Sequence, residues 1–289
     1  MLNDLFQSIV TQIQFDVELV IVNDGSFDET MTTINNWINN QRIKIKYYYQ
    51  EHSGRGLALR KALLNADGEY SIIMDDDDYF TDGAFGLINE SIQKLRSMSN
   101  LKRQLVGICF LCLDEDRKIL GDQFKDKEYI TDFCAMRLIE RVLGDKKEIV
   151  KTEIIKKNIF DHHENEKRVV TSTIWHKIAY NYDCLCLNMP IAVKRYVSGG
   201  MSDRLLVLKA ESPNYQIDNC IIKINYPNQF KLKIIILFSA YLWKYWFYGG
   251  TFSLFRVMKS RQIITVLSLP IGIILYIRDQ LIITCMTNK

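Results

Sequence analysis

The stretch that decides the fold runs Tyr70-Ser71-Ile72-Ile73-Met74-Asp75-Asp76-Asp77-Asp78. Its first five residues have the length and composition of a short buried strand. The four aspartates repel one another, and such a cluster at the end of a strand costs free energy unless a cation or solvent neutralises it. Mg²⁺ and Mn²⁺ take oxygen ligands, keep several waters and are commonly completed by substrate phosphates. The stretch therefore predicts a metal and nucleotide-diphosphate site.

A second acidic turn, Asn23-Asp24-Gly25-Ser26, lies upstream of this stretch and follows a predicted buried strand over 18–22. Helical patterns at 30–39 and 57–65 alternate with a strand pattern at 43–49, and this alternation predicts a parallel, doubly wound α/β sheet. Ligands of such sheets bind beyond the carboxyl ends of the strands. We therefore expect Asp24 and the aspartate run to lie on the same rim.

Downstream, the pattern predicts a strand over 105–113, a helix over 173–181, and two short strands over 184–187 and 191–196 on either side of Pro190. The composition shifts between Pro213 and Pro227. We expect a catalytic domain over 1–212 and a basic, apolar, helical tail over 213–289.

Composition and charge limit the classes of function. The 289 residues carry a net charge of +3, which is too small to indicate nucleic acid as a partner. The seven cysteines form no regular framework and no secretory signal precedes them, so we expect reduced thiols on the cytoplasmic side. Core thiols are a better interpretation of Cys109 and Cys112 than half of a zinc site.

Two motifs resemble glycosyltransferase family 2, whose GT-A fold enzymes move a sugar from a nucleotide-sugar donor. The segment 19–30 is similar to the family's strand followed by Asp-Asp-Gly-Ser-x-Asp-x-Thr, and 68–79 is similar to its Gly-Glu-Tyr strand with Asp-x-Asp-Asp. Gly144-Asp145-Lys146, 175–179 and 199–203 resemble later pieces of a bacterial subgroup. The resemblance implies a GT-A, Rossmann-like fold over the first two thirds of the chain.

The resemblance also implies roles for single residues. Asp24 would hold the nucleotide base, Asp75 would contact the ribose or diphosphate, and Asp77 would bind Mn²⁺ or Mg²⁺, with Asp75 as a further metal ligand. The residues expected around the donor are Asp24, Gly25, Ser26, Arg55, Arg60, Asp75 and Asp76. Each motif also has a simpler interpretation: Asp24-Gly25-Ser26 as a turn with a helix cap, and the aspartate run as a solvated loop or a weak calcium site.

Two departures from the family concern the first strand and the catalytic base. The family's first strand, with Pro-x-Tyr-Asn, precedes the point at which this sequence starts, and its absence would leave a sheet without a central member. We expect a late start in the reading frame rather than a degraded gene or a substitute segment. The subgroup's general base is usually a Glu at the position of Thr171, which cannot take a proton near neutral pH. Glu166 and Asp145 are the alternative bases, besides Asp161 and Glu164.

The tail contains two apolar runs, one rich in aromatic residues over 234–247 and one over 263–277 that Pro270 and Gly272 interrupt. Neither reaches the length of about 20 apolar residues that a spanning helix needs. Trp, Tyr, Lys and Arg around apolar stems predict helices that lie on an anionic inner leaflet, at the cytoplasmic face of the cell membrane. A helical cap or an oligomer interface is the alternative.

Together these observations predict a metal-dependent, inverting glycosyltransferase that uses a UDP-sugar or similar donor. The expected acceptor is a surface glycan or a lipid-linked glycan. Two alternatives stay open: a membrane-peripheral relic of the same fold with impaired catalysis, and a nucleotidyltransferase, because related sheets also place aspartates and Mg²⁺ near a nucleotide.

Overall fold

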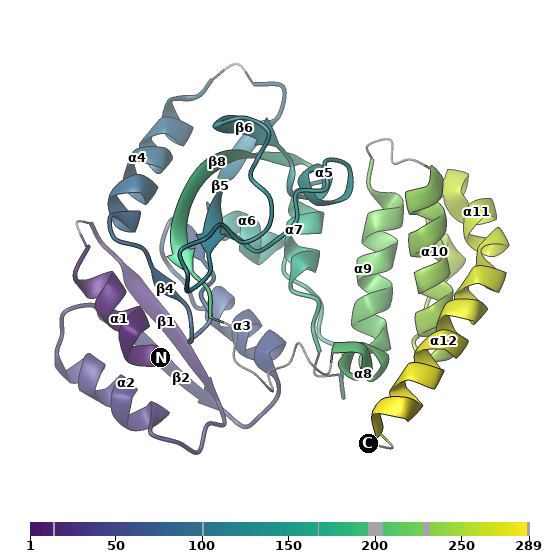
Figure 1. Ribbon diagram of the computed structural model, residues 1–289, viewed down its shortest axis with the longest axis horizontal. Coiled ribbons are helices and arrows are strands. Elements are labelled where there is room, and N and C mark those ends of the chain that lie inside the picture. Colours follow the sequence, from purple (N-terminus) through teal and green to yellow (C-terminus); the bar gives the residue numbers. More distant parts are fainter. Residues whose placement is uncertain (14, 100, 167, 196–204, 228–231, 288–289) are drawn as a thin grey trace. The chain divides into compact units, whose positions relative to one another are not determined.

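The computed structural model describes residues 1–13, 15–99, 101–166, 168–195, 205–227 and 232–287 (Figure 1). The chain divides into two compact units. The first, here called the sheet unit, comprises 1–53, 58–159 and 181–196, and the second, the helical unit, comprises 54–57, 160–180 and 197–289. This division differs from the expected boundary between 212 and 213, because segments upstream of that boundary belong to the helical unit.

The sheet unit begins with helix α1 (Leu2–Val10), strand β1 (Glu18–Asp24), helix α2 (Thr30–Asn39) and strand β2 (Lys44–Gln50). The amphipathic α1 buries Leu5, Phe6 and Ile9, and the ring of Phe6 stacks on Trp37 of α2 with 4.9 Å between centroids. Strands β1 and β2 pair in parallel along their whole length. Helix α3 (Arg55–Leu64) follows, as the alternating pattern predicts.

A second, six-stranded sheet has the order β3-β7-β5-β8-β4, with β6 also paired to β8. Its strands are β3 (Tyr70–Ile72), β4 (Tyr79–Phe80), β5 (Gln104–Leu113), β6 (Glu128–Thr131), β7 (Lys146–Lys151) and β8 (Tyr182–Val193). The helices of this part are α4 (Ala84–Ser97), α5 (Phe133–Leu138) and α6 (Thr152–Lys157). The predicted α/β class is confirmed.

The sheet is more mixed than the predicted, mostly parallel one. Among the described strands only β1–β2 and β5–β8 pair in parallel, whereas β7 runs antiparallel to both β3 and β5. The alternation of strand and helix that predicts parallel pairing covers the first part of the chain. Loops, strand β6 and the short helix α5 lead from β5 to β7, so the chain can reverse its direction there.

Strand pairing is interrupted between β1 and β3. Within the described residues β1 pairs with β2 and β3 pairs with β7, and neither has a second strand partner. The two sheets still meet near the starts of these strands, where Glu18 Oε1 accepts the N–H groups of Asp67 and Gly68, the latter at 2.9 Å.

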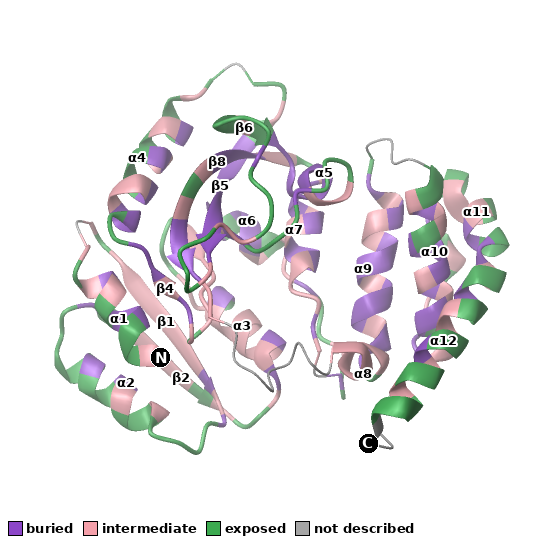
Figure 2. Cartoon of the chain, viewed as in Figure 1, coloured by how far each residue is buried: buried purple, intermediate pink, exposed green. Residues whose placement is uncertain are grey.

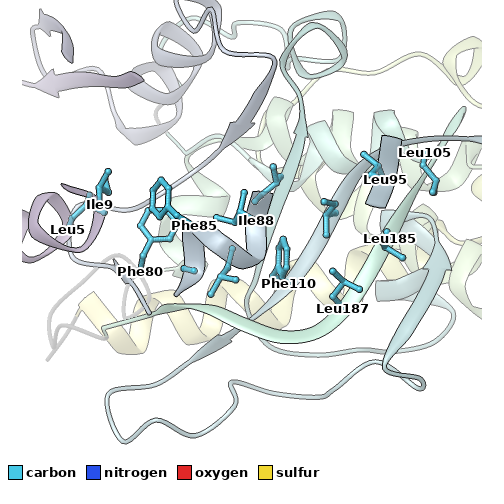
Figure 3. Packing of buried hydrophobic residues seen from close by; sticks show 14 of the residues in the cluster. Leu5, Ile9, Phe80, Phe85, Ile88, Leu95, Leu105, Phe110, Leu185 and Leu187 are labelled. Carbon is cyan, nitrogen blue, oxygen red and sulfur yellow. The ribbon is translucent and has the colours of Figure 1, made fainter. Parts of the chain in front are cut away.

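Buried apolar residues from both ends of the sheet unit form its core. Leu5 and Ile9 of α1 join Phe85 and Ile88 of α4, and this cluster continues to Phe110 of β5 (Figure 3). Leu185 and Leu187 of β8 close it. Burial of this apolar surface stabilises the strand ends that carry the candidate site.

Strand β8 corrects the expected pair of short strands around Pro190. One strand runs from Tyr182 to Val193 and passes through the proline. The register between β5 and β8 shifts on both sides of the pair Leu111–Pro190. A proline is tolerated at such an irregularity because the ladder hydrogen bond it cannot donate is already interrupted there.

The helical unit contains α7 (Ser172–Ile178), α8 (Leu205–Ala210), α9 (Pro213–Asn225), α10 (Leu232–Phe247), α11 (Gln262–Leu267) and α12 (Leu269–Thr287). Two short 3₁₀ helices, η1 (Leu254–Arg256) and η2 (Lys259–Arg261), precede α11. Helix α10 packs against α9 and α12.

Helix α12 is longer than the sequence predicts. Pro270 is its second residue, where a missing N–H costs no helical hydrogen bond, so the proline starts the helix rather than interrupting it. The stretch Leu269–Met286 is long and apolar enough to cross a membrane by length and composition alone, which is weak evidence for a span. Much of α12 is exposed (Figure 2).

Candidate active site

The four aspartates form a tight turn between β3 and β4 of the sheet unit. The N–H of Asp78 donates to the carbonyl oxygen of Asp75 at 3.2 Å, so the chain folds back within the run. This turn separates the carboxylates: Asp76 is exposed, Asp75 and Asp77 are half-buried, and Asp78 is fully buried. We call residues 75–78 the acidic turn.

Two lysines from distant strands compensate part of its charge. Lys147 of β7 is buried and its Nζ lies 2.8 Å from Asp78 Oδ2. Lys194, which follows β8, lies 3.1 Å from Asp75 Oδ2 and 3.3 Å from Asp78 Oδ2. Burial opposes the charge of Lys194, but Asp75, Asp78 and Asp145 outweigh it and raise the pKa of this lysine. The lysines hold two of the four carboxylates in place.

Asp77 has a different environment. Within the part of the chain that the structure describes, no cation pairs with its carboxylate. Burial raises the pKa of Asp77, and the neighbouring charges of Asp78, Asp75 and Asp76 add to this effect. An ionised Asp77 therefore lacks the neutralisation that Asp78 receives, which is the condition that a divalent cation relieves.

The donor atoms of the acidic turn fit a hard cation that substrate phosphates complete. Asp77 offers a half-buried carboxylate, and Oδ1 of Asp78 is buried without a hydrogen-bond partner. Across the described residues, no group of three or more His, Cys, Asp or Glu side chains is arranged to hold a metal by itself. Mg²⁺ and Mn²⁺ are commonly held by one or two carboxylates plus phosphate oxygens, so a complete protein cage is not required.

The second predicted motif is a fixed turn at the end of β1. Asp24 Oδ1 accepts hydrogen bonds from Gln50 Nε2 at 2.7 Å and from the N–H of Ser53 at 2.8 Å, and His52 Nδ1 lies 3.1 Å from Oδ2. Gly25 has φ +78°, and a Cβ there would lie 2.9 Å from the backbone nitrogen of His52. Only glycine fits this turn without strain.

Ser26 continues the turn. Its N–H donates to Asn23 Oδ1 at 2.8 Å, and Asn23 is itself buried and bonded to the hydroxyl of Tyr47. Helix α2 begins after its N-cap residue Glu29, and the side chain of Glu29 accepts no hydrogen bond from the first turn of the helix. The Asp24 turn therefore does not cap α2, which was its simpler interpretation.

Asp145 lies near the acidic turn. Gly144 before it adopts φ +81°, and Asp145 Oδ2 lies 3.6 Å from Lys194 Nζ. The side chain of Asp145 is half exposed at 50%. Lys194 thus lies close to Asp75 and Asp78 of the acidic turn and to Asp145, which comes from a separate segment of the sequence.

Other predicted residues lie elsewhere. Glu166 belongs to the helical unit, where it is 7% exposed and accepts hydrogen bonds from the N–H and Nδ2 of Asn214 and from the N–H of Tyr215. Both of its oxygens thus hold the start of α9, which accounts for this residue structurally. Thr171 precedes α7 in the same unit. The motif 199–203 lies outside the described residues.

The two predicted arginines fall in different units. Arg55 begins α3 within the helical unit, whereas Arg60 follows in the sheet unit and has a buried Nε without a hydrogen-bond partner. The sequence did not identify Lys147 and Lys194 as site residues. Strand β7 carries four charged residues among its six, so the sequence did not single out Lys147, and the end of β8 carried no signal for Lys194.

Comparison with known proteins follows the same motifs. The family model described as glycosyl transferase family 2 matches residues 1–103, which include both the Asp24 turn and the acidic turn. The chain is similar to glycosyl transferase family 2 over residues 1–103, about a third of its length. This family 2 region contains β1, β2, β3 and β4, so the match confirms the resemblance on the strands that carry the two motifs.

Curated relatives match a part of the chain. An uncharacterized glycosyltransferase of Rickettsia typhi is 33% identical over 79 residues, covering 27% of this chain and 24% of the relative. The dolichyl-phosphate beta-glucosyltransferase of Trichomonas vaginalis is 31% identical over 116 residues, covering 37% and 35%. The chain thus spans between about a quarter and a third of the length of these relatives.

Solved structures extend the likeness in fold beyond the family 2 region. S. aureus TarS 1–349 in complex with UDP-GlcNAc has a TM-score of 0.59 at 16% identity, covering 95% of this chain and 85% of that one. The same TarS segment in complex with UDP has a TM-score of 0.58. The likeness to these structures confirms the predicted GT-A fold.

Proposed function

We propose that this protein is a metal-dependent glycosyltransferase that takes a nucleotide-sugar, in particular a UDP-sugar, as donor. The observation that carries the proposal is the uncompensated carboxylate of Asp77 on a turn whose other buried carboxylates are held by Lys147 and Lys194. The family 2 match over this turn and the UDP-GlcNAc complex of the TarS neighbour support the choice of donor.

Different residues of the chain would bind the metal, the base and the phosphates of the donor. Asp77, with Asp75, would hold Mn²⁺ or Mg²⁺, and Asp76 is the exposed carboxylate beside them. The rigid turn of Asp24, Gly25 and Ser26 would receive the base. Arg60 is the proposed phosphate contact within the sheet unit, because a guanidinium offers paired donors to phosphate oxygens, and a phosphate contact by Arg55 stays a prediction from the sequence. A bound divalent cation would offset the charge that develops on the leaving diphosphate.

Asp145 is the base that we carry forward for inverting transfer. Its carboxylate is half exposed, and Oδ2 lies 3.6 Å from Lys194 Nζ. Glu166, in contrast, is buried and accepts hydrogen bonds from the start of α9. A general base must reach the proton of the acceptor hydroxyl, and an accessible carboxylate beside the acidic turn satisfies this first requirement. Asp145 would take that proton as the hydroxyl attacks the anomeric carbon.

The proposed acceptor is a surface or lipid-linked glycan at the cytoplasmic face of the membrane. Support comes from the apolar side chains that α11 and α12 expose: Ile263 (73%), Leu267 (72%), Ile274 (66%) and Leu281 (64%). Such a surface, with Lys259 and Arg261 just before it, has the chemistry of a segment that lies on anionic lipid.

The test of activity measures the product that leaves the donor. Purified protein with UDP-GlcNAc, Mn²⁺ and a lipid-linked glycan acceptor should release UDP, and Asp77→Ala should abolish the release. Release of pyrophosphate from a nucleoside triphosphate and a sugar phosphate would favour a nucleotidyltransferase instead. No turnover with any nucleotide-sugar would favour the impaired relic.

The test of membrane contact uses anionic vesicles of phosphatidylglycerol. The wild-type chain should float with the vesicles, and Ile274→Asp with Leu281→Asp should reduce the bound fraction severalfold. Leu143→Asp is the matched control, because this exposed leucine (63%) belongs to the sheet unit. Equal flotation of all three proteins would contradict the membrane role of α12.

A further inference from the structure

We propose that Lys194 is a built-in counter-ion of the acidic turn, which competes with the divalent cation for the carboxylates and keeps the metal affinity low until a donor binds. The inference rests on the proposed function for the assignment of the metal to Asp77 and Asp75, and it adds a regulating residue to that site. Lys194, the acidic turn and Asp145 all belong to the sheet unit.

The first step is the contrast between the two lysines beside the acidic turn. Lys147 Nζ lies 2.8 Å from Asp78 Oδ2, and the side chain of this lysine is 6% exposed. The side chain of Lys194 is 15% exposed, and its Nζ lies at longer distances from three carboxylates: 3.1 Å from Asp75, 3.3 Å from Asp78 and 3.6 Å from Asp145. An ammonium that is shared among several acceptors near solvent exchanges partners more readily than one in a short buried pair.

The second step is the fixed backbone from which this side chain extends. The N–H of Lys194 donates to the carbonyl oxygen of Leu113 at 2.8 Å, next to the last pair of β5 with β8. The following residue, Arg195, has its Nη1 2.6 Å from Asp4 Oδ2 and its guanidinium carbon 4.7 Å from the centre of the Tyr79 ring. Movement at Lys194 is therefore confined to its flexible four-carbon side chain, which keeps the charge near the turn.

The third step is that Lys194 and the metal need the same carboxylate. Asp75 is a proposed metal ligand, and its Oδ2 makes the shortest of the three contacts of Lys194 with carboxylates. Asp77, the other proposed ligand, lies two residues further along the same turn. A divalent cation on Asp75 shares that carboxylate with the ammonium group, and like charges so close together repel each other strongly in a half-buried place. The metal therefore binds well only when the lysine withdraws.

The consequence is a metal affinity that depends on the donor. Without a donor, Lys194 already neutralises part of the turn, so a metal ion gains little by replacing it. The diphosphate of a nucleotide-sugar brings negative charge and further oxygen ligands, which commonly complete Mg²⁺ and Mn²⁺ sites, so the metal then outcompetes the lysine. Asp145 remains as a partner for the displaced ammonium group. By linkage, metal and nucleotide strengthen the binding of each other.

The experiment titrates Mn²⁺ into the full chain by calorimetry, first without UDP and then with saturating UDP. Without UDP, Lys194→Met should bind Mn²⁺ about tenfold more tightly than the wild type does, because the competing charge is gone. UDP should then tighten Mn²⁺ binding by a smaller factor in this variant than in the wild type. Lys194→Arg keeps the charge and should show no gain. Lys127→Met removes an exposed lysine of the sheet unit and is the matched control, with unchanged affinity.

The sign of the change separates this role from a purely structural one. A lysine that only positions the turn would, when removed, weaken metal binding about tenfold to a hundredfold, as the loss of partners behind metal ligands does. Unchanged or weaker Mn²⁺ binding in Lys194→Met therefore overturns the proposal.

A second variant decides the matter if Lys194→Met does not fold. Asp145→Asn removes one of the three carboxylates that share the ammonium group, at a half-exposed position. Lys194 should then stay closer to Asp75, and Mn²⁺ binding without UDP should weaken severalfold. Unchanged Mn²⁺ affinity in Asp145→Asn overturns the proposal as well.

Comparison with Asp77→Ala separates the role of Lys194 from the metal assignment. If Asp77→Ala abolishes Mn²⁺ binding while Lys194→Met does not increase it, the metal site stands and the role of Lys194 fails. If Asp77→Ala binds Mn²⁺ as the wild type does, the metal assignment fails, and the role of Lys194 fails with it.

Discussion

Two buried lysine–aspartate pairs have nearly the same geometry and different surroundings. In the sheet unit, Lys147 Nζ lies 2.8 Å from Asp78 Oδ2, with exposures of 6% and 0%. In the helical unit, Lys244 Nζ lies 2.8 Å from Asp279 Oδ2, with exposures of 5% and 1%. Asp78 has Lys194 as an additional cation but shares its turn with three further carboxylates, whereas Asp279 has Arg278 as its additional cation.

The difference in charge around the two pairs shows which feature indicates a binding site. The pair Lys244–Asp279 joins α10 to α12 and leaves no negative charge unmatched, so it is explained by packing alone. The pair Lys147–Asp78 anchors a turn in which Asp77 stays uncompensated. A buried ion pair is therefore weak evidence for function, and the excess charge beside it is the stronger evidence.

The largest expected effect is on stability, and it should be alike at both pairs. Lys147→Ala and Lys244→Ala each leave a buried aspartate without its main partner, which costs about 3–5 kcal/mol of unfolding free energy. Urea denaturation measures the difference from the wild type. A loss below about 1 kcal/mol at either position would show that the pair is not buried as described.

Replacing both residues of each ion pair should affect UDP binding differently in the two regions. Lys244→Met with Asp279→Leu should leave metal-dependent UDP binding unchanged. Lys147→Met with Asp78→Leu should weaken that binding at least about tenfold, because the turn loses its anchor and Lys194 loses a partner. Calorimetric titration with UDP and Mn²⁺ measures both. Equal losses of UDP affinity in the two double variants would contradict the view that one pair is purely structural and the other belongs to a binding site.

The pH dependence of metal binding should follow Asp77. A metal ligand must be ionised, and the pKa of Asp77 lies above the ordinary value of 3.8 because of burial and neighbouring carboxylates. Mn²⁺ affinity should therefore begin to fall, by at most about tenfold per pH unit, at a pH above that at which an ordinary aspartate protonates. Affinity that stays constant down to pH 4 would contradict this assignment.

The smallest effect is a gain in stability from Asp77→Asn. Because the folded-state pKa is raised, the ionised carboxylate costs stability at pH values above that pKa, and the cost disappears below 3.8. The variant should therefore melt slightly higher than the wild type at pH 7 with a chelator present, and equally at pH 3.5. Asp126→Asn, an exposed loop residue, should show no such gain.

The sequence predicted what depends on neighbours in the chain. The strand before the acidic turn and the strand before Asp24 both lie where the apolar runs place them, because a short apolar run followed by a polar turn is local information. Lys147 and Lys194 escaped prediction because strand pairing across β3, β7, β5 and β8 brings them to the turn. The start of α12 at Leu269, with Pro270 as its second residue, was missed because the position of a proline within a helix, and not its presence, decides its effect.

Calorimetric titration of UDP with Mn²⁺ into the wild-type chain and into Asp77→Asn tests the central claim most directly. The wild type should bind UDP in a manner that depends on Mn²⁺, and the variant should lose that dependence while keeping a cooperative thermal transition. Metal-dependent binding of equal strength in Asp77→Asn would contradict the account, because the uncompensated carboxylate would then have no part in holding the metal.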